Sequence, residues 1–359
     1  MRNGAPILVG GGRYIQGKDE INNLGREVLY QGKRVILVVD DIPWQKLEKK
    51  VSDNLVENGI EYTVHLFSGY CSDSNTSAIA RKAKEFGAEV LVGLGGGRCM
   101  DTSKWSAELT GIPVITVPTS SATCASYVFQ CVMYDDFGTS LYSNFTTKEV
   151  AAVLVDTQII ADAPARLYSS GVGDALAKLP EMTFSINHAS SDWEQSVLPK
   201  IGLAISKFTD EIFFEKALGA LEDIRQHKVT SDLEDVVNTA IQLTGLISCF
   251  ASGGKQLAIA HSIYDCVTKY FKPQRANFLH GEIVSSGLAV QYGVNGMREE
   301  EIERRSKFLK DLGVPTNLRG IGIEPTEDNK KIILDYVFKH MEFDAKMKEM
   351  VQKNFERIW

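Results

Sequence analysis

The first part of the chain alternates between two patterns of hydrophobic and polar residues. Short apolar runs rich in β-branched residues are typical of buried strands, and the stretches between them carry apolar residues at helical spacing. The predicted strands are Val35–Val39, Tyr62–Leu66, Val90–Gly93, Val114–Val117 and Ala152–Val155, and the predicted helices are Trp44–Asn58, Ser74–Phe86 and Thr102–Leu109. This alternation predicts a parallel sheet covered by helices on both faces, with a ligand at the carboxyl ends of the strands.

A different pattern begins after Pro164, where strand signals fade and long helical patterns follow. These patterns cover Leu176–His188, Gln195–Gln226, Leu233–Phe250, Gln256–Tyr270, Ile283–Tyr292, Glu299–Leu312 and Thr326–Met341. We therefore expect an α/β domain over residues 1–164 and an all-helical domain over residues 165–359. Within the first, a turn cluster at Tyr134–Gly138 lies between two β-compatible runs and predicts a hairpin over Gln130–Tyr142.

The composition limits the class of protein. The 359 residues are 44% hydrophobic and 24% charged, which is typical of a soluble globular enzyme. A net charge of −7 without a basic block argues against a nucleic-acid partner, and no apolar run approaches the roughly 18 residues that span a bilayer. The six cysteines are scattered without a CxxC pair, and the first residues lack the apolar core of a signal peptide. We expect a cytoplasmic protein with a small-molecule substrate.

Three consecutive glycines, Gly95–Gly97, follow a predicted strand and precede a helical pattern. Glycines let the backbone approach a ligand closely, and a helix that opens at about Arg98 would direct its free N–H groups at a phosphate. Asp101 and Lys104 lie one turn further and are expected to reach a bound nucleotide. The loop fits neither the GxGxxG fingerprint nor a Walker A loop. Tight packing of a helix on the sheet is the structural alternative.

Two other predicted strand ends carry residues suited to a nucleotide. Asp40 and Asp41 follow the run 35–39, where a carboxylate accepts a ribose 2′-hydroxyl and disfavours a 2′-phosphate. This favours NAD over NADP, and a helix cap is the alternative. The hydroxyl-rich segment Pro118–Thr123 follows the run 114–117 and suits a pyrophosphate or nicotinamide, unless it is an ordinary turn.

The second half contains a possible set of metal ligands. Asp174, placed at a predicted helix start behind two glycines, is followed much later by His261 and His280. One carboxylate and two imidazoles leave coordination positions open for a substrate oxygen, as in catalytic zinc or iron(II) sites. The alternatives are a helix cap for Asp174 and buried structural roles for the histidines.

The ordered motifs together resemble the iron-containing (group III) alcohol dehydrogenases, in their glycerol dehydrogenase and hydroxycarboxylate dehydrogenase branch. The motifs are Arg13–Gly17, Val38–Asp41, Gly95–Lys104, Val117–Ser120, Gly171–Leu176, Ala260–His261 and Leu279–Glu282. The resemblance implies a Rossmann-like nucleotide domain and an all-α domain in the two-domain architecture of dehydroquinate synthase. It also implies a cleft that binds NAD and a divalent metal, zinc or iron, and a homo-oligomer.

The resemblance also implies roles for particular residues. Asp174, His261 and His280 become the metal ligands and, with Cys124 and Tyr264, the catalytic-site residues. The residues assigned to the cofactor are Asp40, Gly96, Gly97, Arg98, Asp101, Thr119, Ser120, Thr123, Val128, Gln130 and Tyr134.

Three positions depart from the pattern of glycerol dehydrogenases. Cys124 stands where they usually carry an aspartate that holds the polyol, and its segment Ala122–Ala125 is more similar to the branch that reduces 2-oxo acids. Tyr264 replaces a second histidine near the metal and is a candidate for relaying a proton. Pro180 is expected to kink the helix that begins at Asp174.

The predicted reaction is reversible hydride transfer between NAD(H) and a small alcohol, polyol or 2-hydroxy acid. The alternatives are a 2-oxo-acid reductase, a glycerol-1-phosphate dehydrogenase, a lyase similar to dehydroquinate synthase, and a nucleotide-binding homologue without catalytic activity.

Overall fold

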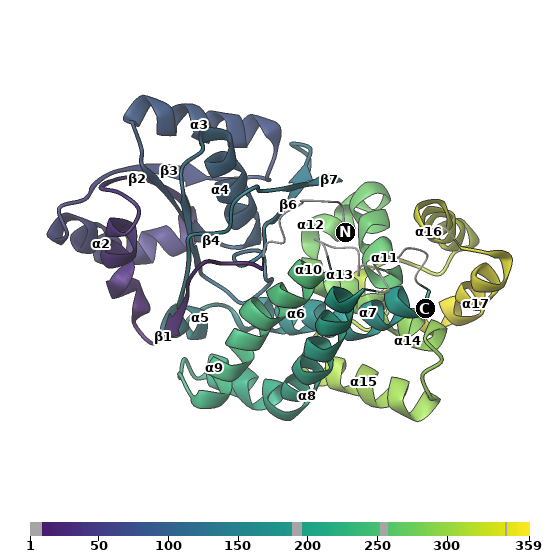
Figure 1. Cartoon of the computed structure of the whole chain (residues 1–359). Coiled ribbons are helices and arrows are strands. Elements are labelled where there is room, and N and C mark those ends of the chain that lie inside the picture. Colours follow the sequence, from purple (N-terminus) through teal and green to yellow (C-terminus); the bar gives the residue numbers. More distant parts are fainter. Residues whose placement is uncertain (1–8, 189–195, 252–257, 342) are drawn as a thin grey trace.

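A six-stranded parallel sheet forms the core of the N-terminal half in the computed structural model, which describes residues 9–188, 196–251, 258–341 and 343–359 (Figure 1). The strand order is β1-β8-β5-β4-β2-β3. The bounds are β1 (Tyr14–Gly17), β2 (Arg34–Asp40), β3 (Glu61–Phe67), β4 (Val90–Gly95), β5 (Val114–Pro118) and β8 (Ala152–Asp156). All neighbouring strands are parallel, so their carboxyl ends meet at one edge, as the alternating pattern predicts.

Helices cover both faces of this sheet. The bounds are α1 (Leu24–Leu29), α2 (Asp41–Glu57), α3 (Asp73–Phe86), α4 (Gly97–Thr110) and α5 (Thr157–Ala161). Along β2, Val35 and Leu37 pack in one apolar cluster with α1 and α2, whereas Ile36 and Val38 pack in another with α3 and α4. Burial on both faces explains why the predicted strands are continuous apolar runs.

A separate two-stranded hairpin projects from this half, as predicted. β6 (Gln130–Tyr134) pairs antiparallel with β7 (Ser140–Phe145), and the register shifts between Met133 and Tyr134. The turn contains Gly138 at φ 86°, a left-handed conformation that favours glycine.

The second half is helical, which confirms the predicted fold class. Its helices are α6 (Ala165–Leu176), α7 (Lys178–Asn187), α8 (Val197–Arg225), α9 (Ser231–Asn238), α10 (Thr244–Phe250), α11 (Ile259–Tyr270), α12 (Lys272–Asn277), α13 (His280–Ser286), α14 (Leu288–Val294), α15 (Glu299–Asp311), α16 (Glu327–His340) and α17 (Ala345–Phe355). A π-helical turn joins α9 to α10. The predicted helix starts at Gln195 and Gln256 lie outside the described residues.

The expectation that a helix begins at Asp174 is wrong. Asp174 lies in the last turn of α6, and the chain leaves regular helix at Ala177 before α7 begins. In a continuous helix the ring of Pro180 would collide with the carbonyl of Leu176, and the break avoids this. Pro180 instead lies in the first turn of α7, where a missing N–H costs little.

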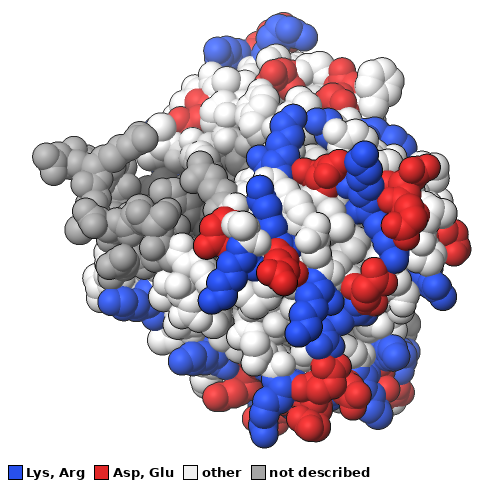
Figure 2. All heavy atoms as spheres, turned by 90° about the vertical axis from the view of Figure 1, so that its right-hand side faces the viewer, with Lys and Arg blue, Asp and Glu red and all other residues white. Residues whose placement is uncertain are grey.

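Charged side chains of both signs are mixed on the face that carries α16 and α17 (Figure 2). No helix of the described residues is long and apolar enough to cross a membrane. The limits of the two predicted domains, 1–164 and 165–359, stay a prediction.

Candidate active site at the edge of the sheet

A cavity of about 1090 Å³ lies where the carboxyl ends of the strands meet the helical half. Sixteen of the residues that the sequence suggests for the cofactor, the metal and the catalytic site line it, whereas Lys104 does not. They are Asp40, Gly96, Gly97, Arg98, Asp101, Thr119, Ser120, Thr123, Cys124, Val128, Gln130, Tyr134, Asp174, His261, Tyr264 and His280. The structure therefore brings these sixteen residues together, while the role of each residue stays a prediction.

The glycine loop is held by Asp40 from the neighbouring strand. The backbone N–H of Gly96 donates to Asp40 Oδ2 over 2.7 Å, and Asp40 makes no capping bond to α2. A Cβ on Gly95 would lie 2.3 Å from the same oxygen, so only glycine fits there. Burial raises the pKa of Asp40, and the N–H of Gly96 and the charge of Arg98 oppose this effect. The carboxylate thus shapes the loop as well as facing the cavity.

The helix α4 opens at Gly97 with its free N–H groups toward the cavity. A Cβ on Gly97 would lie 2.8 Å from Thr123 Oγ1, which shows how closely the hydroxyl-rich segment approaches the loop. The N–H of Thr119 donates to Gly95 O over 3.0 Å and joins the two strand ends. A helix N-terminus flanked by glycines and hydroxyl groups suits a pyrophosphate.

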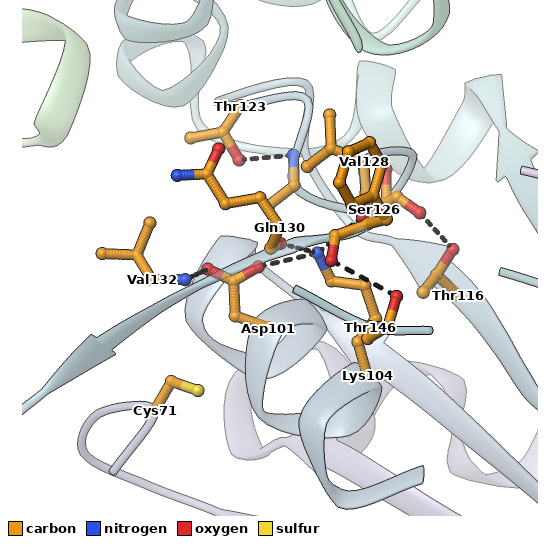
Figure 3. A network of polar contacts seen from close by, with 12 residues as sticks. Cys71, Asp101, Lys104, Thr116, Thr123, Ser126, Val128, Gln130, Val132 and Thr146 are labelled. Carbon is orange, nitrogen blue, oxygen red and sulfur yellow. Dashed lines mark hydrogen bonds and ion pairs between the residues drawn. The ribbon is translucent and has the colours of Figure 1, made fainter. Parts of the chain in front are cut away.

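The expectation that Lys104 contacts the nucleotide is wrong, because this side chain is fully buried and does not line the cavity. Figure 3 shows its ammonium group among oxygen atoms. Nζ donates to the carbonyls of Val128, over 2.9 Å, and of Gln130, and lies 2.9 Å from Asp101 Oδ1. Asp101 Oδ2 accepts from the N–H of Val132 over 3.1 Å. The pair Asp101–Lys104 therefore fixes the start of the hairpin.

Asp174, His261 and His280 form a compact cluster. Asp174 Oδ1 lies 3.1 Å from Nε2 of His280 and 3.3 Å from Nε2 of His261. One ligand atom from each residue falls within 4.8 Å of the others. The residues come from the end of α6 and the first turns of α11 and α13. This set of one oxygen and two nitrogens fits zinc or iron(II) and leaves coordination positions open.

Glycines allow the helices that carry these ligands to approach closely. A Cβ on Gly281 would lie 1.8 Å from the carbonyl of Ser170 in α6. A Cβ on Gly171 would lie 1.9 Å from the carbonyl of Ser121, which follows β5. Glycines beside Asp174 and His280 are therefore part of how the chain assembles the cluster.

Glu181, which the sequence analysis did not identify, orients His261. Its side chain is fully buried, and Oε2 lies 2.6 Å from Nδ1 of His261. Oε1 accepts from the backbone N–H groups of Ala258 and His261. A carboxylate on Nδ1 leaves Nε2 to face the cluster, the usual arrangement behind a metal-binding imidazole.

The charges in the cluster act strongly on one another. Burial raises the pKa of Asp174, but the charges of His280 and Lys178 and a bond from His261 lower it well below its usual range. Burial lowers the pKa of His261, but Glu181 and Asp174 raise it to about 9. Asp174 is therefore a carboxylate, as a metal ligand must be.

Known proteins are similar to this chain in sequence and in fold. The sequence model of the iron-containing alcohol dehydrogenase family matches residues 11–157. The glycerol dehydrogenase of Thermotoga maritima is 32% identical over 324 residues, which are 88% of this chain and 85% of that protein. The chain belongs to the iron-containing alcohol dehydrogenase family. As a member, it is an oxidoreductase of the alcohol dehydrogenase type.

Other similar proteins are named after different substrates. The glycolaldehyde reductase of Halobacterium salinarum is 30% identical over 315 residues, 88% of this chain and 84% of that protein. Hydroxycarboxylate dehydrogenase A of Escherichia coli is 28% identical over 275 residues, 77% of this chain and 73% of that protein. The structure of glycerol dehydrogenase from Schizosaccharomyces pombe matches with a TM-score of 0.84 and 23% identity, over 98% of this chain and 90% of that one.

Further side chains line the cavity beside the cluster of Asp174, His261 and His280. The Tyr264 ring packs edge-on against His280 at 4.2 Å between centroids, and its hydroxyl lies 3.2 Å from that of Tyr134. Cys124 and Lys178 are buried and line the same region. Burial raises the pKa of Cys124, so its thiol is neutral. Lys178 was not identified from the sequence, where only its position one turn after Asp174 hinted at the site.

Proposed function

We propose that this protein transfers hydride reversibly between NAD and a small alcohol, polyol or 2-hydroxy acid, with a divalent metal ion bound by Asp174, His261 and His280. The observation that carries the proposal is that a glycine loop suited to a nucleotide and a three-ligand cluster line the same cavity. Hydride transfer requires the nicotinamide and the reacting alcohol in one place. We also propose a cytoplasmic homo-oligomer, with domains 1–164 and 165–359 on either side of the cavity.

The residues of the cluster suit a catalytic ion. A divalent cation held there supplies a Lewis acid toward the substrate oxygen, and zinc and iron(II) both suit the ligand set. Glu181 keeps the imidazole of His261 in the tautomer that presents Nε2 to the cluster. The backbone bonds to Glu181 Oε1 prevent the carboxylate from turning away.

The other half of the cavity suits NAD, the hydride carrier. Asp40 presents a carboxylate at the end of β2, which favours a free ribose 2′-hydroxyl over a 2′-phosphate. The N-terminus of α4, with Gly96 and Gly97, would receive the pyrophosphate. Tyr134 would lie at the nicotinamide end, because its hydroxyl contacts Tyr264 beside His280.

Tyr264 is a hydrogen-bond donor in this proposal. Burial raises its pKa, so the phenol stays protonated at neutral pH. Its hydroxyl, paired with that of Tyr134, can donate to the substrate oxygen or pass a proton along the pair.

An assay with NAD or NADH, zinc or iron(II), and a panel of polyols, aldehydes, 2-hydroxy acids and 2-oxo acids tests the proposal. NADH should form in step with product, whereas a lyase would regenerate its cofactor. His280→Ala should lose both bound metal and turnover, and His65→Ala, outside the cavity, should keep both. Absence of turnover on the whole panel would refute the proposal, and full activity in His280→Ala would refute the ligand assignment.

A further inference from the structure

We propose that the ammonium group of Lys178 binds the carboxylate of the substrate, so that 2-hydroxy acids and their 2-oxo products are the preferred substrates. This inference rests on the proposed function and names its substrate class. Lys178 is the first residue of α7, directly after the turn at Ala177 that separates α6 from α7.

Lys178 is a buried cation without a partner. Its side chain lines the cavity and is 5% exposed. Within the part of the chain that the structure describes, its ammonium group makes no hydrogen bond or ion pair. Two other buried cations have partners: Lys104 is paired with Asp101 and two carbonyls, and Arg305 is paired with Asp210. A buried charge is unfavourable unless something pairs with it, so a ligand in the cavity is the expected partner.

The neighbours of Lys178 keep its ammonium group charged but form no hydrogen bond or ion pair with it in the part of the chain that the structure describes. Burial lowers its pKa, but Asp174, Cys124 and Glu181 outweigh burial and raise the pKa above its usual value. Asp174 faces the two histidines of the cluster, and Glu181 is bonded to His261 and to backbone N–H groups. Cys124 is a neutral thiol and supplies no counter-charge.

The other cations that line the cavity are placed differently, and one of them, Lys46, is exposed. Arg166 is bound by Glu282 through two hydrogen bonds of 2.6 and 2.7 Å. Arg98 lies over the Tyr70 ring at 4.9 Å, beside the glycine loop. Arg275 lies over the Tyr264 ring at 5.7 Å, its Nε is buried without a hydrogen-bond partner, and it therefore provides the rival position for an anion. Lys178 lines the cavity at the start of α7, one turn after Asp174, and its charge, after that of His280, lowers the pKa of Asp174.

A 2-hydroxy acid matches this arrangement because its hydroxyl and carboxylate are on adjacent carbons. With the hydroxyl oxygen at the Asp174–His261–His280 cluster, the carboxylate lies next to it, where Lys178 is available. The C2–H bond breaks, the hydride with both electrons reduces NAD⁺, the hydroxyl proton passes along the Tyr264–Tyr134 pair to solvent, and a 2-oxo acid forms. A polyol reacts in the same way but places a neutral hydroxymethyl group beside the ammonium group, which stays unpaired.

Lactate and 1,2-propanediol test the inference, because they differ in having a carboxylate or a hydroxymethyl group on the same skeleton. The wild-type enzyme should favour lactate in kcat/KM. Lys178→Met should lower kcat/KM for lactate by roughly 10- to 100-fold, as expected for a lost charged hydrogen bond, and change that for propanediol much less. Lys178→Arg should keep the preference, and Lys353→Met, an exposed lysine on α17, should behave as the wild type.

Binding of oxamate to the NADH complex, followed by calorimetry, provides a readout without turnover. Lys178→Met should weaken oxamate binding by roughly 10-fold or more, with unchanged metal content. Equal losses for lactate and propanediol, or loss of oxamate binding in Arg275→Met instead of Lys178→Met, would overturn the inference. Turnover of propanediol without preference for lactate would also overturn it and leave the proposed function standing. No turnover of any substrate would refute both.

Discussion

Glu181 and His261 are joined by a short contact of 2.6 Å between the carboxylate Oε2 and the imidazole Nδ1. This contact fixes which nitrogen of His261 faces Asp174 and makes the imidazole more basic toward a cation. Glu181→Gln should therefore weaken metal binding by roughly 10- to 100-fold. Competition with a chelator of known affinity measures the change.

The matched control is Glu349→Gln, the same substitution at an exposed position on α17. It should leave metal affinity unchanged. Wild-type affinity in Glu181→Gln would mean that the carboxylate has only a structural role, bonding the backbone at Ala258 and His261.

Asp40 should set the preference for NAD. In Asp40→Asn the side-chain amide oxygen can still accept the N–H of Gly96, but the side chain no longer repels a 2′-phosphate. This substitution should lower the ratio of NADPH to NADH dissociation constants by roughly 10-fold, since like charges in contact are costly. Asp41 is exposed and bonded to Gln45, so Asp41→Asn should change the ratio much less. Fluorescence titration of both reduced cofactors measures the ratio, and equal effects of the two substitutions would contradict the assignment.

Gly95 and Gly96 should differ sharply in their tolerance of a methyl group. In Gly95→Ala the new Cβ would lie 2.3 Å from Asp40 Oδ2 and 2.8 Å from Cys99 Cβ, so the substitution should destabilise the protein by about 1–3 kcal/mol. In Gly96→Ala the nearest atom is 3.6 Å away, and stability should change by less than about 0.5 kcal/mol. Urea unfolding without nucleotide compares the two variants. Equal stabilities would show that the loop can shift to accommodate a methyl group at Gly95.

Lys104 should contribute to folding and not directly to nucleotide binding. Lys104→Met leaves Asp101 without its cation and two carbonyls without their donor, which should cost about 3–5 kcal/mol. Lys46 is exposed at the rim of the cavity, so Lys46→Met should stay within about 0.5 kcal/mol of the wild type. The free energy of unfolding measured without nucleotide distinguishes the two roles of Lys104. If Lys104 only contacted the nucleotide, Lys104→Met would leave that free energy unchanged.

The fold could be predicted because the strands are buried on both faces and therefore read as continuous apolar runs, such as Val35–Val39. The ordered motifs also allowed the candidate residues to be assigned to one cleft. By contrast, α17 was missed, and a helix was expected to begin at Asp174, which in fact lies in the last turn of α6. Helix ends in this half depend on packing against neighbouring helices. Apolar periodicity alone does not record those contacts.

The side chains that position others were the hardest to predict. Lys104 belongs to a motif of the nucleotide loop, yet its rotamer carries the ammonium group to the hairpin, away from the cavity. Glu181 lies seven residues after Asp174, but the two residues belong to different helices, α6 and α7, so helical spacing does not connect them. The role of Glu181 becomes visible only when α11 brings His261 beside it.

Cys124 should determine whether Lys178 is available to a substrate. Both side chains line the cavity, and each influences the pKa of the other. An aspartate at position 124 would place a negative charge beside the ammonium group and pair with it. Cys124→Asp should therefore weaken oxamate binding and lower the preference for lactate over 1,2-propanediol by roughly 10-fold or more, while the neutral Cys124→Ser should retain both.

A double-mutant cycle separates this pairing from a general disturbance of the site. If the aspartate acts through Lys178, Cys124→Asp should have little further effect on oxamate binding in a Lys178→Met background, because no ammonium group remains to be neutralised. Additive losses would mean that the aspartate repels the carboxylate directly and that Lys178 is not its partner. Calorimetry of the four proteins with NADH and oxamate gives the coupling free energy, and comparable metal contents show that the cluster at Asp174 is intact in each.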